Sequence, residues 1–293
     1  MRIIDAFAPA KINLTLHVIG QRADGYHLLD SLVAFGPMGD RLVLRESDAL
    51  SLSVAGPEAA GVPADPSNLV LKAAALLSRP AGQGAEIHLD KHLPPASGIG
   101  GGSSDAAAAL RALAALWDQP LPAETAQLGA DVPMCLMPQP QRVRGIGETL
   151  DPVALPPLPA LLVNPRVEVP TPAIFEGLDS KDNPPMPEAL PSFTGAPDCI
   201  DWLATQRNDL QAPAIASAPV IGEVLDGLMM LPGCRLARMS GSGATCFALF
   251  ETLDGAQAAE AMLAQRRPDW WRASGMLGDQ TQKAQPQNRA FSS

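Results

Sequence analysis

A glycine-rich run that opens directly onto a helix-forming segment is the feature that most constrains this chain. The run is GIGGGSS at residues 98–104, and DAAAALRALAALW follows it at residues 105–117. Glycine adopts left-handed backbone conformations without strain and lets a ligand approach backbone N–H groups closely. The first turn of the helix adds unpaired N–H groups and the positive end of the helix dipole. The segment therefore predicts a binding site for a phosphate.

Two common phosphate-binding motifs do not describe this run. A Walker A loop needs a Lys directly after its last glycine, and none follows Gly102. The dinucleotide fingerprint G-x-G-x-x-G fails at its sixth position, which is Ser103. A flexible surface turn is the plainer interpretation of the run. The hydroxyls of Ser103 and Ser104 at the helix start favour contact with phosphate or Mg²⁺ instead.

The charge and the cysteine content argue against several classes of protein. A net charge of −10 leaves no basic stripe of the kind that nucleic-acid binding needs. The four cysteines are widely spaced and form no C-x-x-C pair, which argues against a zinc site and a disulfide framework. The sequence has neither a signal-peptide core nor an apolar run of about 18 residues. We expect a cytoplasmic protein with reduced thiols, without a nucleic-acid or membrane partner.

Residue periodicity predicts an α+β fold. Residues 12–18 alternate apolar and polar side chains, and extending this strand back would put Lys11, Asn13, Thr15 and His17 on its polar face. Further strands are expected at residues 41–45, 50–54, 85–89, 160–163 and 246–250. Further helices are expected after Ser67 as N-cap, over residues 220–231, and over residues 255–267 with Asp254 as N-cap. Helices and strands do not alternate strictly, which favours α+β over α/β.

Proline marks the domain organisation. The chain contains 30 prolines, and the proline-rich segment 151–159 is the best candidate for a domain boundary. We therefore expect an N-terminal domain of residues 1–155 and a C-terminal domain of residues 156–279. The tail, residues 280–293, is polar and has no periodicity, so we expect it to be disordered.

Four segments together resemble one family. They are APAKINLTLHVIGQRADGYH at 8–27, LPPASGIGGGSSDAAAAL at 93–110, GADVP at 129–133 and SGSGATCFALF at 240–250. In this order they are similar to the GHMP small-molecule kinases over nearly the whole chain. RADGYH is similar to the branch of the family whose small-molecule substrate carries cytidine diphosphate. The resemblance implies a two-domain GHMP kinase fold, with an N-terminal domain like domain 2 of ribosomal protein S5 and a ferredoxin-like C-terminal domain.

The resemblance also implies an activity. It is the ATP-dependent phosphorylation of the 2-hydroxyl of a cytidylylated methylerythritol in the non-mevalonate isoprenoid pathway, with Mg²⁺ to neutralise phosphate charge. The metal ligands and the choice between monomer and homodimer stay open. A GHMP kinase for homoserine, mevalonate or a sugar is one alternative, and such an enzyme has no need of Tyr26 and His27. A catalytically silent nucleotide-binding protein of the same fold is the other, and Lys11 and Asp131 argue against it.

By the same resemblance, Asp131 is the general base that accepts the proton of the attacking hydroxyl. Lys11 keeps that carboxylate ionised and stabilises the developing alkoxide. The residues alone leave plainer interpretations open: Asp131 precedes Val132–Pro133 as a helix N-cap, and Lys11 is a solvated lysine at a strand end. The segment between Leu121 and Gly129 is shorter than in the family, so we expect a short or tightly connected helix before Asp131.

The binding residues also follow from the resemblance. The expected ATP site comprises Asn68 and Lys91 near the adenine and the loop residues Pro94, Pro95, Ala96, Ser97, Gly98, Ile99, Gly100, Gly101, Gly102, Ser103 and Ser104. In the acceptor site, Tyr26 stacks on cytosine, His27 hydrogen-bonds the polar edge of the base, and Asn13 orients the methylerythritol hydroxyls. The remaining acceptor-site residues are Thr171, Phe175 and the turn Gly241, Ser242 and Gly243, for which a plain strand-entry turn is the alternative.

Overall fold

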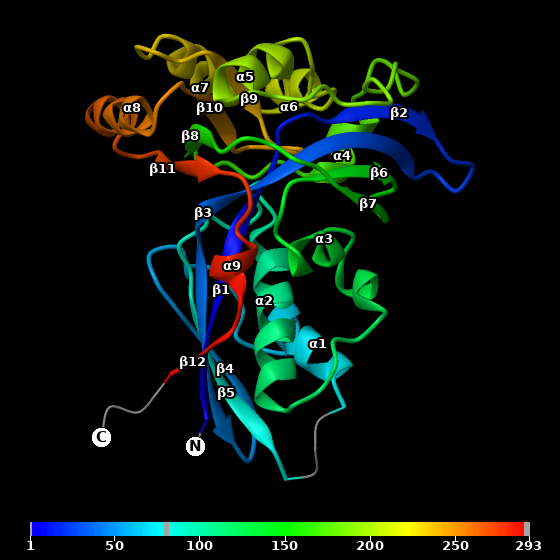
Figure 1. Cartoon of the computed structure of the whole chain (residues 1–293), viewed down its shortest axis with the longest axis vertical. Coiled ribbons are helices and arrows are strands. Elements are labelled where there is room, and N and C mark those ends of the chain that lie inside the picture. The colour runs from blue at the N-terminus through cyan, green and yellow to red at the C-terminus, as the bar shows by residue number, and fades with distance from the viewer. Residues whose placement is uncertain (1, 79–81, 290–293) are drawn as a thin grey trace.

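The computed structural model describes residues 2–78 and 82–289, and these residues form two sheets with helices (Figure 1). The larger sheet has eight strands: β1 (Ile3–Asn13), β2 (His17–Gln21), β3 (His27–Ser47), β4 (Leu50–Ala55), β5 (Gly84–Asp90), β6 (Gln141–Gly145), β7 (Thr149–Pro152) and β12 (Gln287–Asn288). The smaller has four: β8 (Leu158–Asn164), β9 (Leu236–Met239), β10 (Cys246–Leu249) and β11 (Trp271–Leu277). The predicted α+β class is confirmed.

Strand β3 links the two ends of the molecule (Figure 1). Its second half lies between β1 and β5 in the order β12-β1-β3-β5-β4, and its first half pairs with β2 and β6. The smaller sheet has the order β11-β8-β10-β9. It lies in the upper half of Figure 1, whereas β4, β5 and β12 of the larger sheet lie in the lower half. A shared apolar cluster that includes Ile12 and Leu32 of the larger sheet and Leu162 and Phe247 of the smaller joins the two sheets.

Two helices cover one face of the larger sheet. They are α1 (Leu69–Leu76) and α2 (Gly101–Leu116). The buried alanines 106–109 of α2 let the helix approach β1 closely, because they have no long side chains to keep the two apart. The short elements η1 (Thr125–Leu128) and α3 (Val132–Leu136) follow α2. The helices of the smaller sheet are α4 (Thr171–Glu176), α5 (Ala196–Ala204), α6 (Gln211–Ser217), α7 (Val220–Met229) and α8 (Leu253–Arg266).

The expected continuous strand over residues 12–18 is interrupted. β1 ends at Asn13 and β2 begins at His17, because the N–H groups of Leu14 and Thr15 both point to the carbonyl of Leu32, at 2.7 and 3.4 Å. The four residues of the expected polar face, Lys11 among them, are all buried. Alternation thus identifies a two-faced segment, but here both faces are covered by protein.

The predicted disorder of the tail is wrong for residues 280–289. Helix α9 (Thr281–Ala284) and β12 follow β11, and β12 pairs with the edge of β1 through Ile4 and Asn288. The N–H of Arg289 donates to the carbonyl of Ile3, so backbone pairing holds a polar segment that has no apolar periodicity. Residues 290–293 of the predicted tail lie outside the described residues.

Two helix N-caps differ from expectation. The side chain of Asn68, not Ser67, accepts the N–H of Val70 at the start of α1. The side chain of Thr252, not Asp254, accepts the N–H of Gly255 at the start of α8. Each helix start has two residues of types that cap well, Ser67 and Asn68 for α1 and Thr252 and Asp254 for α8. The residue types alone therefore do not determine which residue is the cap.

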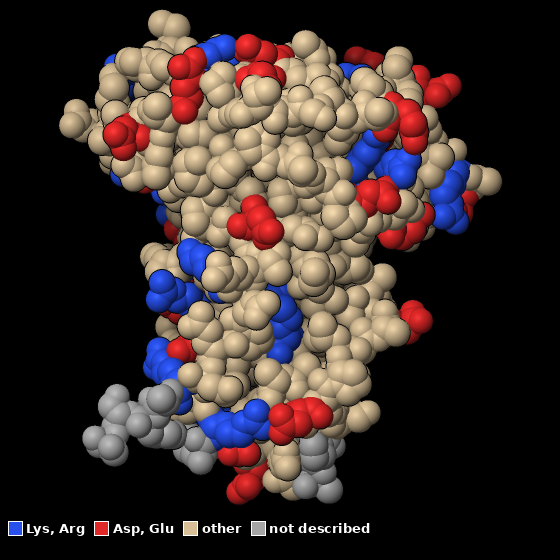
Figure 2. All heavy atoms as spheres, in the orientation of Figure 1, with Lys and Arg blue, Asp and Glu red and all other residues tan. Residues whose placement is uncertain are grey.

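A membrane span requires a long apolar helix, and a nucleic-acid partner requires a basic surface. None of the helices within residues 2–78 and 82–289 combines the length and apolar character needed to cross a bilayer. On the face in Figure 2, acidic and basic side chains are interspersed, without a continuous basic stripe among the described residues.

The cap of α1 gives a test of these contacts. Asn68→Ala should lower the free energy of unfolding by about 1 kcal/mol, because the N–H of Val70 loses its partner. Ser67→Ala is the matched control and should change it by less than about 0.5 kcal/mol, since the exposed Ser67 side chain caps nothing in the described structure. Urea unfolding measures both, and equal losses would contradict the assignment.

Candidate active site

The glycine run and the turn of residues 240–243 lie against each other. Gly98 has φ +76°, and a Cβ placed there would lie 2.5 Å from the carbonyl oxygen of Gly243. Across this contact, the Ser240 hydroxyl donates to the carbonyl of Gly98 at 3.1 Å, and the N–H of Thr245 donates to the carbonyl of Ser97 at 3.1 Å. The two sheets therefore contribute one loop each to a single hollow of about 400 Å³.

Helix α2 presents its first turn to this hollow. It begins at Gly101, inside the glycine run, so Gly101, Gly102 and Ser103 line the hollow as helical residues. Gly100 precedes them in the left-handed region, at φ +65°, and no side chain of the described residues caps the helix. The N–H groups of the first turn are thus available to an anion, which the helix dipole also favours.

Lys11 and Asp131 form an ion pair at the edge of the hollow. Lys11 Nζ at the far end of β1 lies 3.0 Å from Asp131 Oδ2, with 6% and 37% of the two side chains exposed. Asp131 stands directly before α3, but its carboxylate caps no backbone N–H of the described residues. The plainer interpretation of Lys11 as a solvated lysine is therefore wrong, because its side chain is buried. Asp131 does occupy the N-cap position of α3, but its carboxylate pairs with Lys11 and does not cap the helix.

The connection to Asp131 is short, as expected. The segment before Gly129 contains only η1, a single 3₁₀ turn from Thr125 to Leu128. Gly129 then has φ +152°, and the N–H of Val132 donates to its carbonyl at 3.1 Å. This short turn brings the carboxylate of Asp131 to Lys11 on β1.

A second lysine, Lys91, is buried between two carboxylates. Lys91 Nζ donates to Asp105 Oδ2 at 2.8 Å and to Asp40 Oδ2. Burial raises the pKa of Asp105 to about 8, with Lys91 opposing the shift and Asp40 adding to it. Burial disfavours the charge on Lys91, but the Asp105 and Asp40 carboxylates outweigh this effect and raise its pKa. The other oxygen of Asp40 accepts the N–H groups of His92 and Leu93, so this cluster anchors the chain just before the glycine run.

A wider hollow of about 740 Å³ adjoins the first and is lined by Asn13, Tyr26, His27, Thr171 and Phe175 of the expected acceptor site. The expected acceptor residues Gly241, Ser242 and Gly243 line the first hollow instead. The His27 and Phe175 rings stack in its wall with centroids 4.7 Å apart, and Tyr26 stands beside them with 61% of its surface exposed. Burial, with the charge of Lys181, lowers the pKa of His27, so its ring is neutral at pH 7. His27 Nε2 is buried without a hydrogen-bond partner among the described residues.

Five residues line both hollows. They are Asn13, Leu29, Asp131, Thr171 and Phe175. The hydroxyls of Thr171 and Ser242 lie 2.7 Å apart, which links α4 to the second glycine turn. A ligand in the wide hollow can therefore reach the Lys11–Asp131 pair and the glycine loops.

Several expected ATP-site residues do not line either hollow. They are Asn68, Lys91, Pro94, Pro95, Ile99 and Ser104. The Asn68 side chain caps α1, Ile99 is in the core, and the Ser104 hydroxyl donates to the carbonyl of Pro9. Asn68 therefore belongs to the start of α1, whereas Ile99 and Ser104 hold the loop to the core and to β1.

Sequence reasoning missed part of the acceptor wall. Ser31, Met134, Val143, Ile146, Gly147 and Lys181 line the wide hollow. The only local signal for any of them is the close pair of glycines in RGIGE at 144–148. The others depend on how β3, β6 and α3 meet in space.

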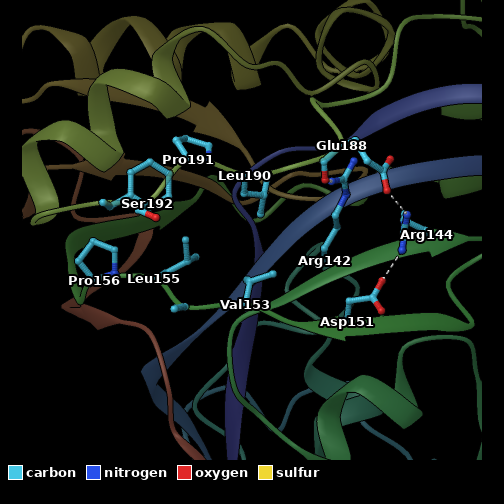
Figure 3. Close-up of a pocket in the computed structure, with 12 residues that line it drawn as sticks. Arg142, Arg144, Asp151, Val153, Leu155, Pro156, Glu188, Leu190, Pro191 and Ser192 are labelled. Atoms are coloured by element: carbon cyan, nitrogen blue, oxygen red, sulfur yellow. Dashed lines mark hydrogen bonds and ion pairs between the residues drawn. The ribbon is translucent and has the colours of Figure 1, made fainter.

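A third hollow lies on the opposite face of β6 and contains none of the expected residues (Figure 3). Arg142 and Arg144 border it, whereas Val143 between them lines the acceptor hollow. Arg142 makes two hydrogen bonds of 2.8 Å to Asp30 and also donates to the carbonyl of Pro187. In Figure 3, Arg144 lies between Asp151 and Glu188. These contacts hold β6, and with it one wall of the acceptor hollow.

Comparison with known proteins gives consistent matches. Models of the GHMP kinases N terminal domain and the GHMP kinases C terminal match residues 68–139 and 194–269. A 4-diphosphocytidyl-2-C-methyl-D-erythritol kinase from Dinoroseobacter shibae is 64% identical over 277 residues, 94% of this chain and 96% of that protein. A crystal structure of 4-(cytidine 5'-diphospho)-2C-methyl-D-erythritol kinase is 36% identical, with TM-score 0.77, and covers 94% of this chain and 99% of that one. Homoserine kinase from Cytophaga hutchinsonii, 20% identical with TM-score 0.65 and coverages of 98% and 97%, shares the fold.

The Lys91 cluster allows a stability test. Lys91→Met should lower the free energy of unfolding by about 3 to 5 kcal/mol, because it leaves Asp40 and Asp105 buried without their cation. The loss should grow as the pH rises from about 8 to about 10. Lys91 holds the raised pKa of the buried Asp105 carboxyl at about 8, so without Lys91 that carboxyl ionises in the fold only at higher pH, and the variant keeps losing stability where the parent no longer does. Denaturant unfolding across this range measures it. Lys72→Met, on the exposed side of α1, is the control and should change the free energy of unfolding by less than about 0.5 kcal/mol. A change as small as this in Lys91→Met would refute the anchoring role of Lys91.

Proposed function

Since the chain belongs to the 4-diphosphocytidyl-2-C-methyl-D-erythritol kinases of the GHMP kinase family, we propose that it transfers the γ-phosphoryl group of ATP to the 2-hydroxyl of 4-diphosphocytidyl-2-C-methyl-D-erythritol. It is an ATP-dependent kinase of isoprenoid biosynthesis with the two-domain GHMP kinase fold. The observation that carries the assignment of the site is the position of Asp131. Its carboxylate borders both the hollow of the two glycine loops and the acceptor hollow.

We propose that the phosphates of ATP bind in the glycine-loop hollow. The free N–H groups at the start of α2 and the second glycine turn face this space, and both suit an anion. Residues 94–104 form the loop, and Lys91 holds its base in place through Asp40 and Asp105. Asn68 caps the neighbouring helix α1. Their expected contact with adenine stays a prediction.

The acceptor is proposed to lie in the wide hollow. Tyr26 and Phe175 offer aromatic faces to the cytosine ring, and the unpartnered Nε2 of neutral His27 offers a hydrogen bond to its edge. Asn13 and Thr171, which border both hollows, then face the methylerythritol hydroxyls.

In the proposed reaction, Asp131 accepts the proton of the 2-hydroxyl while that oxygen attacks the γ-phosphorus. Lys11, 3.0 Å from the carboxylate, keeps Asp131 ionised and stabilises negative charge on the attacking oxygen. Burial of the lysine strengthens both effects, because the surrounding protein screens its charge less than water does.

We also propose Mg²⁺ as a cofactor, which would neutralise charge on the phosphate oxygens. The residues 2–78 and 82–289 contain no group of three or more His, Cys, Asp or Glu side chains placed to hold a metal. That fits an ion bound mainly by phosphates and water. The protein oxygens in the hollow suited to it are those of Ser103 and Asp131.

The cellular setting is a further proposal. We propose a cytoplasmic monomer or homodimer with no nucleic-acid or membrane partner. Cys135, Cys199, Cys234 and Cys246 are free thiols, which suits a reducing compartment.

An acceptor panel tests the function. We expect ADP release that requires Mg²⁺ and the cytidylylated methylerythritol, because the site matches an aromatic base at one end and a reacting hydroxyl at the other. A coupled ADP assay with this acceptor, homoserine, mevalonate and galactose measures the dependence. Equal turnover of another acceptor, or turnover of none, would overturn the proposal.

Substitution of Asp131 tests the base. Asp131→Asn keeps the size of the side chain but cannot take a proton, so kcat should fall by about 10²- to 10⁴-fold with little change in ATP affinity. Steady-state kinetics and calorimetry with a non-hydrolysable ATP analogue measure the two effects. Asp118→Asn, an exposed residue at the far end of α2, is the control. Near-normal turnover of Asp131→Asn would remove the residue from the mechanism.

A further inference from the structure

The ammonium group of Lys11 has two fixed partners. Besides Asp131 Oδ2 at 3.0 Å, it donates to Asn13 Oδ1 at 2.9 Å. An ammonium group donates hydrogen bonds and accepts none. The Asn13 amide must therefore turn its oxygen toward Lys11 and its nitrogen away from it.

The nitrogen of this amide meets a serine. Asn13 Nδ2 donates to Ser31 Oγ at 2.8 Å, and the Ser31 hydroxyl donates to the carbonyl of Thr15 at 2.5 Å. The series runs from the Lys11 ammonium through Asn13 and Ser31 to the backbone carbonyl of Thr15. Because the ammonium only donates and the carbonyl only accepts, the direction of every hydrogen bond in the series is fixed. All four side chains are buried, and Ser31 is 1% exposed.

The break between β1 and β2 makes this arrangement available. The chain leaves the ladder after Asn13, so the carbonyl of Thr15 points to Ser31 on β3 instead of pairing along a strand. The backbone N–H of Asn13 is held separately by the Ser240 hydroxyl at 3.0 Å. The main chain of Asn13 is thus fixed by the second glycine turn, while Ser31 fixes the orientation of its side-chain amide.

We propose that Ser31 is a positioning residue for phosphoryl transfer, which holds the Asn13 amide so that its oxygen keeps Lys11 beside Asp131. Without the hydroxyl, the Asn13 amide loses the partner of its nitrogen and can turn that nitrogen toward Lys11. Two donors would then face each other, and the ammonium would move from its place beside the carboxylate. The inference rests on the proposed roles of Lys11 and Asp131.

Ser31 also lines the acceptor hollow, so direct contact with the acceptor is the competing explanation. The two roles affect different kinetic constants. Loss of positioning lowers kcat and leaves acceptor binding nearly unchanged, whereas loss of a ground-state contact raises the acceptor KM.

The test compares Ser31→Ala with two further substitutions, one that keeps the hydroxyl and one that replaces it with a thiol. Ser31→Ala should lower kcat by about 10- to 100-fold, as expected for a small misplacement of catalytic groups, with the KM of acceptor and ATP changed by less than about threefold. Ser31→Thr keeps the hydroxyl and should retain kcat within about threefold. Ser31→Cys keeps a side chain of the same connectivity with a larger sulfur atom, which accepts hydrogen bonds weakly, so it should lose turnover as the Ala variant does.

Thr15→Val is the matched control for damage to the fold. The Thr15 hydroxyl accepts the N–H of Leu32 and donates to Met186 Sδ in the same buried region. Only the backbone carbonyl of Thr15 belongs to the series to Lys11, and Thr15→Val keeps that carbonyl. Thr15→Val should lower the melting temperature while kcat stays within about threefold. An equal loss of kcat in Thr15→Val and Ser31→Ala would reduce Ser31 to a structural role.

A double-mutant cycle with Asn13→Ala completes the test. If Ser31 acts through Asn13, then Ser31→Ala should lower kcat by less than about twofold further when Asn13 is already Ala. Additive losses, a raised acceptor KM, or a fully active Ser31→Ala variant would each overturn the inference. Failure of the proposed function itself is distinguishable, because the unsubstituted chain would then show no acceptor-dependent turnover.

Discussion

The backbone contact between Gly98 and residues 240–243 is the constraint on which the site depends. A Cβ at Gly98 would lie 2.5 Å from the carbonyl oxygen of Gly243 and 2.7 Å from that of Ser240, so only glycine allows this approach. The contact brings a loop of the larger sheet and a turn of the smaller sheet to the same hollow. The apolar cluster shared by β1, β3, β8 and β10 joins the two sheets. The Lys11–Asp131 pair lies at the edge of the hollow.

The two buried lysines near the glycine run differ in their partners and therefore in their use. Lys91 lies between two buried carboxylates, one of which also binds the chain before the glycine run, so its charge serves to anchor the loop. Lys11 pairs with one partly exposed carboxylate and one amide oxygen, both of which face the hollow. An ammonium group in this second setting keeps a donor free for a ligand, which is what transfer of a phosphoryl group requires.

The sequence predicts features that depend on local chemistry and misses those that depend on distant segments. The glycine run, the pairing of Lys11 with Asp131, and the place of Tyr26 and His27 in one hollow follow from motifs, although their roles stay predictions. Alternation cannot distinguish a polar face in water from one covered by protein, so the burial of Thr15 and the break before His17 are not foreseen. The Lys91 cluster draws on β3, α2 and the end of β5, and no local pattern links them. The ordered tail depends on a free strand edge, which sequence does not reveal.

A crystal structure with a non-hydrolysable ATP analogue and the acceptor bound together tests the account most directly. The account predicts that the β- and γ-phosphates lie between the two glycine loops, against the first turn of α2. It also predicts the 2-hydroxyl of the acceptor within about 2.6 to 3.2 Å of the Asp131 carboxylate. Phosphates bound away from both loops, or an acceptor whose hydroxyls all point away from Asp131, would contradict it.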